Sequence, residues 1–120
     1  TSADAISAAA ARVASQIRAR AVVTYTASGA TALRIAQRRP SMPILSVTPN
    51  PATARRLVLA WGVHSVMGDD AKDFEEMVNK AQRYAVAEGL AHPGDQLVVT
   101  AGHPFGTPGA TNVLRVMRVS

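Results

Sequence analysis

Segments with helical periodicity alternate with short β-rich segments along the whole of this chain. Apolar residues recur at helical spacing between Ile6 and Ile17, which predicts a helix over residues 3–19. The run Ala-Val-Val-Thr-Tyr at 21–25 is typical of a buried strand. The same patterns predict further helices over 28–39, 50–61 and 71–88, and further strands over 43–47, 63–67, 96–101 and 113–119. Repeated strand–helix units of this kind indicate a parallel sheet covered by helices on both faces.

Residues with strong positional preferences support the predicted helix ends. Ser2 is the expected N-cap of the first helix, and Asn50 followed by Pro51 is the expected start of the third. Pro40 is expected to stop the second helix, because the residue before a proline is disfavoured in the helical region. Gly89 is the expected residue just beyond the fourth.

The chain is expected to form a single α/β domain. Its 120 residues are enough for one core but too few for two. The last two predicted strands are joined only by a loop, and this loop is too short to contain a crossover helix. The final strand is therefore expected to be antiparallel to its neighbour and to lie at an edge of the sheet.

Composition excludes several classes of function. The chain has no cysteine, so it can form neither disulfides nor thiolate metal sites. The formal charge of +5 comes mainly from arginines that are scattered or paired, and aromatic residues for base stacking are few, which argues against nucleic-acid binding. No signal peptide and no membrane-spanning apolar run is recognisable. We therefore expect no membrane partner and a cytoplasmic location.

The loop at 26–31, Thr-Ala-Ser-Gly-Ala-Thr, is the first candidate site. It follows a buried strand and leads into a helix, where free amide N–H groups and the helix dipole favour an anion. Three hydroxyls, from Thr26, Ser28 and Thr31, could donate to phosphate oxygens, and Gly29 would allow close approach. The alternative is that the hydroxyls only cap the helix. The nucleotide-binding pattern GxxxxGK[ST] is absent, so nucleotide triphosphate hydrolysis is not indicated.

The loop at 102–112 is the second candidate. Its glycines and prolines favour a shaped connection with special backbone angles. It is either a lid over the first loop or a wide hairpin turn, and the two loops would face each other if the first and fourth strands are neighbours. The residues of interest are Gly102, His103, Pro104, Phe105, Gly106, Thr107 and Gly109.

Other polar residues are weaker candidates. The three histidines are far apart in sequence and lack metal-ligand spacing, so no metal site is expected. The acidic cluster at 69–76 opens a predicted helix, where negative charge is favourable in any case. Arg55 and Arg56 could reach a phosphate, although a solvated helix face is the commoner outcome. No catalytic residues are assigned to this chain.

Short strings distributed over the whole chain carry a family resemblance. They are AISAAA at 5–10, TASGAT at 26–31, RP at 39–40, PI at 43–44, VTPN at 47–50, ARRL at 54–57, WGV at 61–63, GD at 94–95 and GxPxGxxGxTN at 102–112. In this order and spacing they resemble the C-terminal domain of pyruvate kinases. The resemblance implies a three-layer αβα sandwich whose five-stranded mixed sheet has the order 3-2-1-4-5, with strand 5 antiparallel.

The resemblance also implies a function. Such a domain would bind an allosteric sugar phosphate or nucleotide monophosphate and would contribute to self-association of the subunits. The effector phosphate would lie at Thr26, Ser28, Gly29 and Thr31, and the 102–109 loop would close over the sugar. Phosphoryl transfer from phosphoenolpyruvate to ADP would take place in a catalytic barrel domain of the same chain, which would hold Mg²⁺ and K⁺. No cofactor is expected in this domain.

Two departures from the family pattern concern the effector. Bisphosphate-activated members often carry a basic residue at the position of Ala27, and those from animals and fungi have a longer segment where this chain has the short, acidic 68–72. These departures would leave a second phosphate with few favourable contacts. We therefore expect a monophosphate, such as a hexose phosphate, a pentose phosphate or AMP, in preference to fructose 1,6-bisphosphate.

The relation of these residues to a longer protein leaves two hypotheses. The chain begins next to a helix cap and lacks an initiator methionine, which suggests a domain excised from a longer protein. The alternative is a stand-alone small-anion-binding protein, or a hydrolase, with the same fold. The length of the gene distinguishes the two hypotheses.

Overall fold

The computed structural model describes residues 1–102, 105 and 111–120. The helices are α1 (Ser2–Ile17), α2 (Ala30–Gln37), α3 (Pro51–Leu57) and α4 (Phe74–Ala87), and the strands are β1 (Ala21–Tyr25), β2 (Ile44–Thr48), β3 (Val63–Met67), β4 (Gln96–Gly102) and β5 (Thr111–Arg118). This alternation confirms the α/β fold predicted from the sequence.

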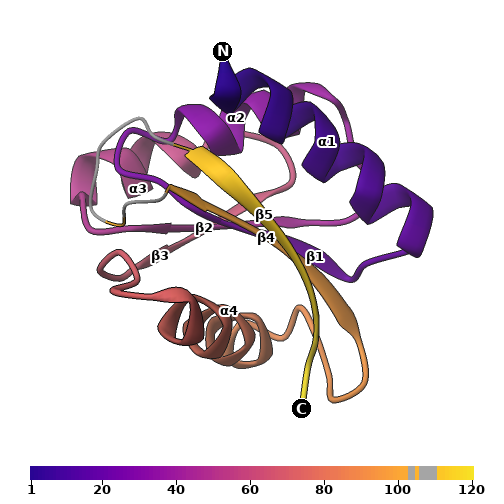
Figure 1. Cartoon of the computed structure of the whole chain (residues 1–120). Helices are drawn as coiled ribbons and strands as arrows, with labels where there is room; N and C mark the ends of the chain where they lie inside the picture. Colours follow the sequence, from indigo (N-terminus) through magenta and orange to yellow (C-terminus); the bar gives the residue numbers. More distant parts are fainter. Residues whose placement is uncertain (103–104, 106–110) are drawn as a thin grey trace.

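The five strands form one sheet in the order β3-β2-β1-β4-β5. The first four strands are parallel, and β5 is antiparallel to β4. Helices α1, α2 and α3 cover one face of the sheet and α4 covers the other, which gives three layers (Figure 1). The expected strand order and the reversed edge strand are both confirmed.

Each face of the sheet has its own apolar layer. On the α1–α3 side, small and branched residues such as Ala10, Ile35 and Leu57 pack on Val22 and Val98 of the central strands. The other layer lies under α4, where Met77, Ala81 and Ala85 pack on the opposite side of the same strands. Because side chains alternate between faces along a strand and both faces are covered, β1 is buried over its whole length and β4 at every residue except its two ends.

Two helices begin at residues other than those predicted. Thr1, and not Ser2, is the N-cap of α1: its hydroxyl oxygen accepts from the Asp4 amide at 3.2 Å. The Asp4 carboxylate in turn accepts from that hydroxyl at 2.9 Å, so the two residues form a reciprocal cap. Asp73 caps α4 by accepting from the Glu76 amide at 2.8 Å, which places residue 71 before the helix and not inside it.

Other predicted boundaries shift by a few residues. Gly29 has a left-handed φ of +85°, so α2 begins at Ala30 and not at residue 28. Helix α3 ends at Leu57 and not at residue 61, whereas its predicted cap is confirmed because the Asn50 side chain accepts from the Ala52 amide. Gly89 directly follows the C-cap of α4 with a φ of +73°, as predicted.

The turn that follows α3 carries exposed apolar side chains. Val58, Leu59 and Trp61 are 73%, 90% and 86% exposed, and we refer to them as the apolar tip. They lie beyond the end of the helix, so they do not contribute to the apolar layer that Leu57 joins.

Candidate anion-binding site

The candidate site lies at the carboxyl ends of β1 and β4. These strands are parallel neighbours, with Thr24 opposite Thr100, and the chain leaves them in opposite directions along the sheet. Ligands of doubly wound sheets bind at such a reversal point. The sequence-based condition for bringing the two candidate loops together, adjacency of β1 and β4, is therefore met.

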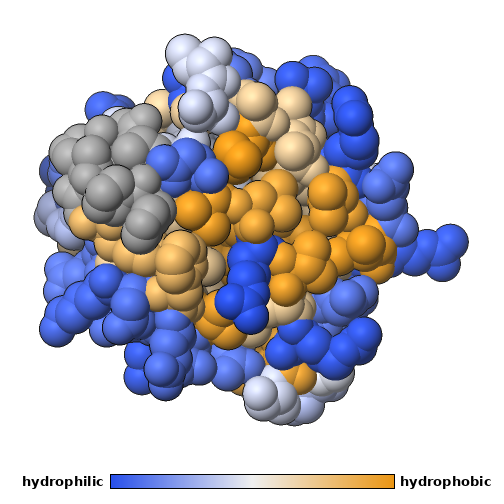
Figure 2. Space-filling view, in the orientation of Figure 1, coloured by the Kyte–Doolittle hydropathy of each residue, from blue (hydrophilic) through white to orange (hydrophobic). Residues whose placement is uncertain are grey.

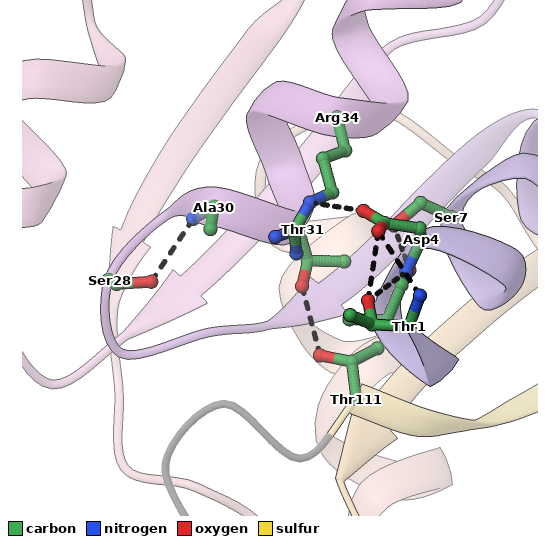
Figure 3. Close-up of polar contacts among 9 residues, drawn as sticks. Thr1, Asp4, Ser7, Ser28, Ala30, Thr31, Arg34 and Thr111 are labelled. Carbon is green, nitrogen blue, oxygen red and sulfur yellow. Dashed lines mark hydrogen bonds and ion pairs between the residues drawn. The ribbon is translucent and has the colours of Figure 1, made fainter.

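Two hydroxyls of the first loop accept hydrogen bonds from its own backbone. The Thr26 hydroxyl oxygen accepts from the Gly29 amide at 2.9 Å. The Ser28 hydroxyl oxygen accepts from the Ala30 amide at 3.3 Å, as Figure 3 shows. The Ser28 hydroxyl thus bonds to the first residue of α2, in line with the capping alternative, whereas the Thr26 hydroxyl bonds to Gly29 before the helix begins. A hydroxyl that accepts in this way keeps its own hydrogen to donate to a further group.

Thr31 lies deeper than the other two hydroxyl residues. It is buried in the first turn of α2, and its Oγ1 lies 2.9 Å from Oγ1 of Thr111, which is also buried. Figure 3 shows the two side chains pointing toward one another from α2 and from the start of β5. This contact joins the first loop to the strand that follows the second loop.

Helix α3 holds the carbonyl groups of the first loop. The Ala27 carbonyl accepts from the Thr53 hydroxyl at 2.8 Å and from the Thr48 hydroxyl at 3.4 Å. The next carbonyl, that of Ser28, accepts from Nη2 of Arg56 at 2.7 Å. The sequence alone did not assign Thr53 to the site and favoured a solvated face for Arg56. Their spacing of three residues, which puts both on one face of a helix, was the available signal.

Gly29 is required where α3 packs against the loop. A Cβ atom at this position would lie 3.1 Å from Cγ2 of Thr53 and 3.2 Å from Cδ2 of Leu57. The φ of +85° also disfavours any residue with a side chain. The close packing at Gly29 is therefore with α3, and the predicted close approach of an anion to this glycine stays a prediction.

The structure describes only the ends of the second loop and Phe105 within it. Gly102 ends β4 opposite Thr111, where the register of the antiparallel pair shifts. The ring of Phe105 packs edge-on against Phe74 at the start of α4, with centroids 5.1 Å apart and planes at 77°. The other predicted loop residues lie outside the described part of the chain: His103, Pro104, Gly106, Thr107 and Gly109.

Comparison with known proteins identifies the family. Residues 4–117 match the family described as pyruvate kinase, alpha/beta domain. This chain belongs to that family. A pyruvate kinase of Methylorubrum extorquens is 43% identical over 120 residues, which make up 100% of this chain and 25% of that protein.

Other pyruvate kinases match in the same way. One from Agrobacterium vitis is 47% identical over 112 residues, covering 93% of this chain and 24% of that protein. One from Geobacillus stearothermophilus is 41% identical over 117 residues, which cover 98% of this chain and 20% of that protein. The chain therefore spans about a quarter or less of the length of these pyruvate kinases.

Some charged residues elsewhere in this pyruvate kinase domain pair with one another. The Glu76 carboxylate lies 3.1 Å from Nζ of Lys80 one turn later, and this contact lowers the pKa of the glutamate. His92 lies 3.9 Å from the Asp95 carboxylate. Across the described residues, no three His, Asp or Glu side chains gather as metal ligands would. In the same residues, no helix has the length and apolar character needed to cross a membrane.

A row of buried hydroxyls crosses the sheet just below the candidate site. The side-chain oxygens of Thr24, Ser46, Ser65 and Thr100 are buried and unpaired within the described part of the chain. Strand register places Ser46 between Thr24 and Ser65, and Thr100 on the other side of Thr24. We refer to these four residues as the hydroxyl row. Because an unpaired buried hydroxyl costs free energy, we expect an apolar residue of similar size to be tolerated at these positions.

Proposed function

We propose that this chain is the regulatory and oligomerisation domain of a pyruvate kinase and that it binds a phosphorylated effector. The full-length enzyme would transfer a phosphoryl group from phosphoenolpyruvate to ADP in a separate barrel domain, with Mg²⁺ and K⁺ bound there. Membership of the pyruvate kinase family supports the proposal that the full-length protein has this activity. The observation that carries the regulatory role is the hydroxyl-rich loop at the reversal point of the sheet.

The proposed effector phosphate lies at Thr26, Ser28, Gly29 and Thr31. Helix α2 begins at Ala30, so its free amide groups and the positive end of its dipole face this loop. Within the described residues, the amides of Thr31 and Ala32 donate no hydrogen bond. Arg56 places a positive charge next to the loop, where its guanidinium donates to the Ser28 carbonyl.

The proposed effector carries one phosphate. Asp69 and Asp70 precede α4, where the family resemblance implies a longer segment for bisphosphate-activated members from animals and fungi, and Asp73 is used as the helix cap. Their carboxylates would repel a second phosphate. A hexose phosphate, a pentose phosphate or AMP fits this arrangement better than fructose 1,6-bisphosphate.

Calorimetric titration of the full gene product tests both points. Glucose 6-phosphate, ribose 5-phosphate and AMP are each compared with fructose 1,6-bisphosphate at the same ionic strength. The proposal requires that at least one monophosphate binds more tightly than the bisphosphate and that Ser28→Asp abolishes binding by placing a carboxylate in the loop. Tighter binding of the bisphosphate would overturn the proposed effector class, and no binding of any of these ligands would overturn the effector site.

Strand β5 is the proposed self-association surface. It lies at an edge of the sheet, and unpaired edge strands favour pairing with another chain. Figure 2 shows apolar surface gathered over β5 and the adjoining side of α1. Val116 on this strand is 41% exposed.

Sedimentation of the full gene product tests this surface. Val116→Lys should shift the protein toward smaller species, because it places a charge in the apolar patch. Val86→Lys is the matched control, since Val86 on α4 is 45% exposed and lies in a different layer. An unchanged sedimentation coefficient for Val116→Lys would exclude β5 as the interface.

A further inference from the structure

Helix α3 contacts the candidate loop on the side away from the Thr26 hydroxyl. We propose that Thr53 and Arg56 are positioning residues of the effector site, which hold the loop backbone so that its donors face the phosphate. This inference rests on the proposed function, because it concerns the same phosphate. It adds α3 as a second element of the site.

The planarity of the peptide bond carries the argument. In a trans peptide the carbonyl of one residue and the N–H of the next point in opposite directions. The Ala27 carbonyl points to the Thr53 hydroxyl, so the Ser28 N–H points away from α3. That N–H donates no hydrogen bond within the described residues. It is therefore available to an anion on the side of the loop opposite to α3.

The next peptide repeats the arrangement. The Ser28 carbonyl points to Arg56, so the Gly29 N–H also points away from α3, and it donates to the Thr26 hydroxyl oxygen. This hydrogen bond leaves the hydroxyl hydrogen of Thr26 free to turn toward a ligand. Two consecutive carbonyls held by α3 thus place two donors, the Ser28 N–H and the Thr26 O–H, on one side of the loop.

Electrostatics favours the same role for Arg56. Its Nη2 lies 2.7 Å from the Ser28 carbonyl and 3.4 Å from the Thr53 hydroxyl, so one guanidinium draws the loop and the helix together. Loop carbonyls left unpaired could rotate toward the phosphate and repel it. Arg55, the preceding residue, is also exposed but makes no hydrogen bond or ion pair in the described part of the chain. The two arginines carry the same charge and differ in this contact.

The test is calorimetric titration of the full gene product with glucose 6-phosphate and with inorganic phosphate. Thr53→Val removes the donor at nearly constant volume, and Thr53→Ser keeps it. Arg56→Gln removes the contact and the charge, and Arg55→Gln removes only an equal charge beside it. We expect Thr53→Val and Arg56→Gln to weaken binding about tenfold, which corresponds to the loss of one hydrogen bond. Thr53→Ser and Arg55→Gln should each stay within about twofold of the unmodified protein.

The possible outcomes separate this inference from the proposed function. Equal losses for Arg55→Gln and Arg56→Gln would mean that only overall charge matters and would overturn the positioning role of Arg56. Unchanged binding by Thr53→Val would overturn that of Thr53. If Thr53→Val does not fold, then Arg56→Gln, at an exposed position, still tests whether α3 positions the loop. Binding absent from the unmodified protein would overturn the effector site itself, and this inference with it.

Discussion

The hydroxyl oxygens of Thr31 and Thr111 lie 2.9 Å apart in the protein interior, although 80 residues separate them in sequence. One belongs to the first turn of α2 and the other to the first residue of β5. The contact therefore connects the proposed effector loop to the proposed self-association strand. Each hydroxyl can act as donor or acceptor, so Thr31 can accept from Thr111 while it donates to a phosphate.

This contact predicts a measurable coupling. Thr31→Val and Thr111→Val should each lower the free energy of unfolding by about 1–2 kcal/mol, because each leaves a buried hydroxyl without its partner. The double variant should lose less than the sum of the two single losses, since it removes both hydroxyls. Chemical denaturation of the four proteins measures the coupling. Strictly additive losses would show that the two hydroxyls do not interact.

The hydroxyl row predicts that the same kind of substitution at Thr100 does not destabilise the fold. Thr100→Val replaces a fully buried hydroxyl, which has no partner among the described residues, by a methyl group of similar size. The free energy of unfolding should stay within about 0.5 kcal/mol or rise, because no hydrogen bond is lost and a polar group is removed from an apolar layer. Denaturation alongside Thr111→Val provides the comparison. A loss of more than about 1 kcal/mol would mean that Thr100 has a partner.

The close packing of Gly29 against α3 predicts that alanine costs more stability there than at a glycine with open space around it. Gly29→Ala should destabilise the fold by about 2–3 kcal/mol, since it combines an unfavourable φ with close contacts to Thr53 and Leu57. Gly94→Ala is the matched control: Gly94 has a φ of +92° but open space around it. It should cost only about 1 kcal/mol. Equal losses in thermal unfolding would indicate that packing against α3 contributes nothing.

Asp4 predicts a pH-dependent contribution to stability. The Thr1 hydroxyl and the Arg34 guanidinium, which lies 2.9 Å from the carboxylate, lower the pKa of Asp4 below its ordinary value of 3.8. A group whose pKa is lower in the folded state stabilises the fold above its unfolded-state pKa, and this stabilisation is lost as the pH falls through the folded-state value. Asp4→Asn should therefore lower the melting temperature at about pH 7 and have little effect at about pH 2.

A matched substitution controls for the loss of one negative charge. Asp69→Asn also removes an exposed carboxylate, but Asp69 makes no ion pair within the described residues. It should change the melting temperature little at either pH. A constant difference between Asp4→Asn and the unmodified protein across the whole pH range would contradict the role assigned to Arg34.

Local patterns predicted the elements better than their ends. The strands at 21–25 and 63–67 agree with β1 and β3 residue for residue, because short β-rich runs between helices leave little choice of boundary. Helix starts depend on which polar side chain turns back onto the backbone. Thr1 and Ser2 are chemically similar candidates, and only the reciprocal contact with Asp4 decides between them.

Contacts between residues far apart in the sequence could not be predicted from local patterns. The strand order came from the family resemblance, since periodicity alone does not say which strands are neighbours. The partner of Thr31 is 80 residues away, and Arg56 reaches a carbonyl 28 residues earlier. The sequence therefore indicated the candidate loop but not the helix that holds it. Whether the loop binds phosphate stays a prediction.

Trp61 in the apolar tip gives the domain an intrinsic optical probe. It is the only tryptophan of the chain, and 86% of its surface is in contact with solvent. Its fluorescence in this chain should have the long emission wavelength of a hydrated indole. Any surface that covers the tip, including another part of a longer enzyme, would shift that emission to shorter wavelengths. Docking at the end of α3 can therefore be followed in real time without a chemical label.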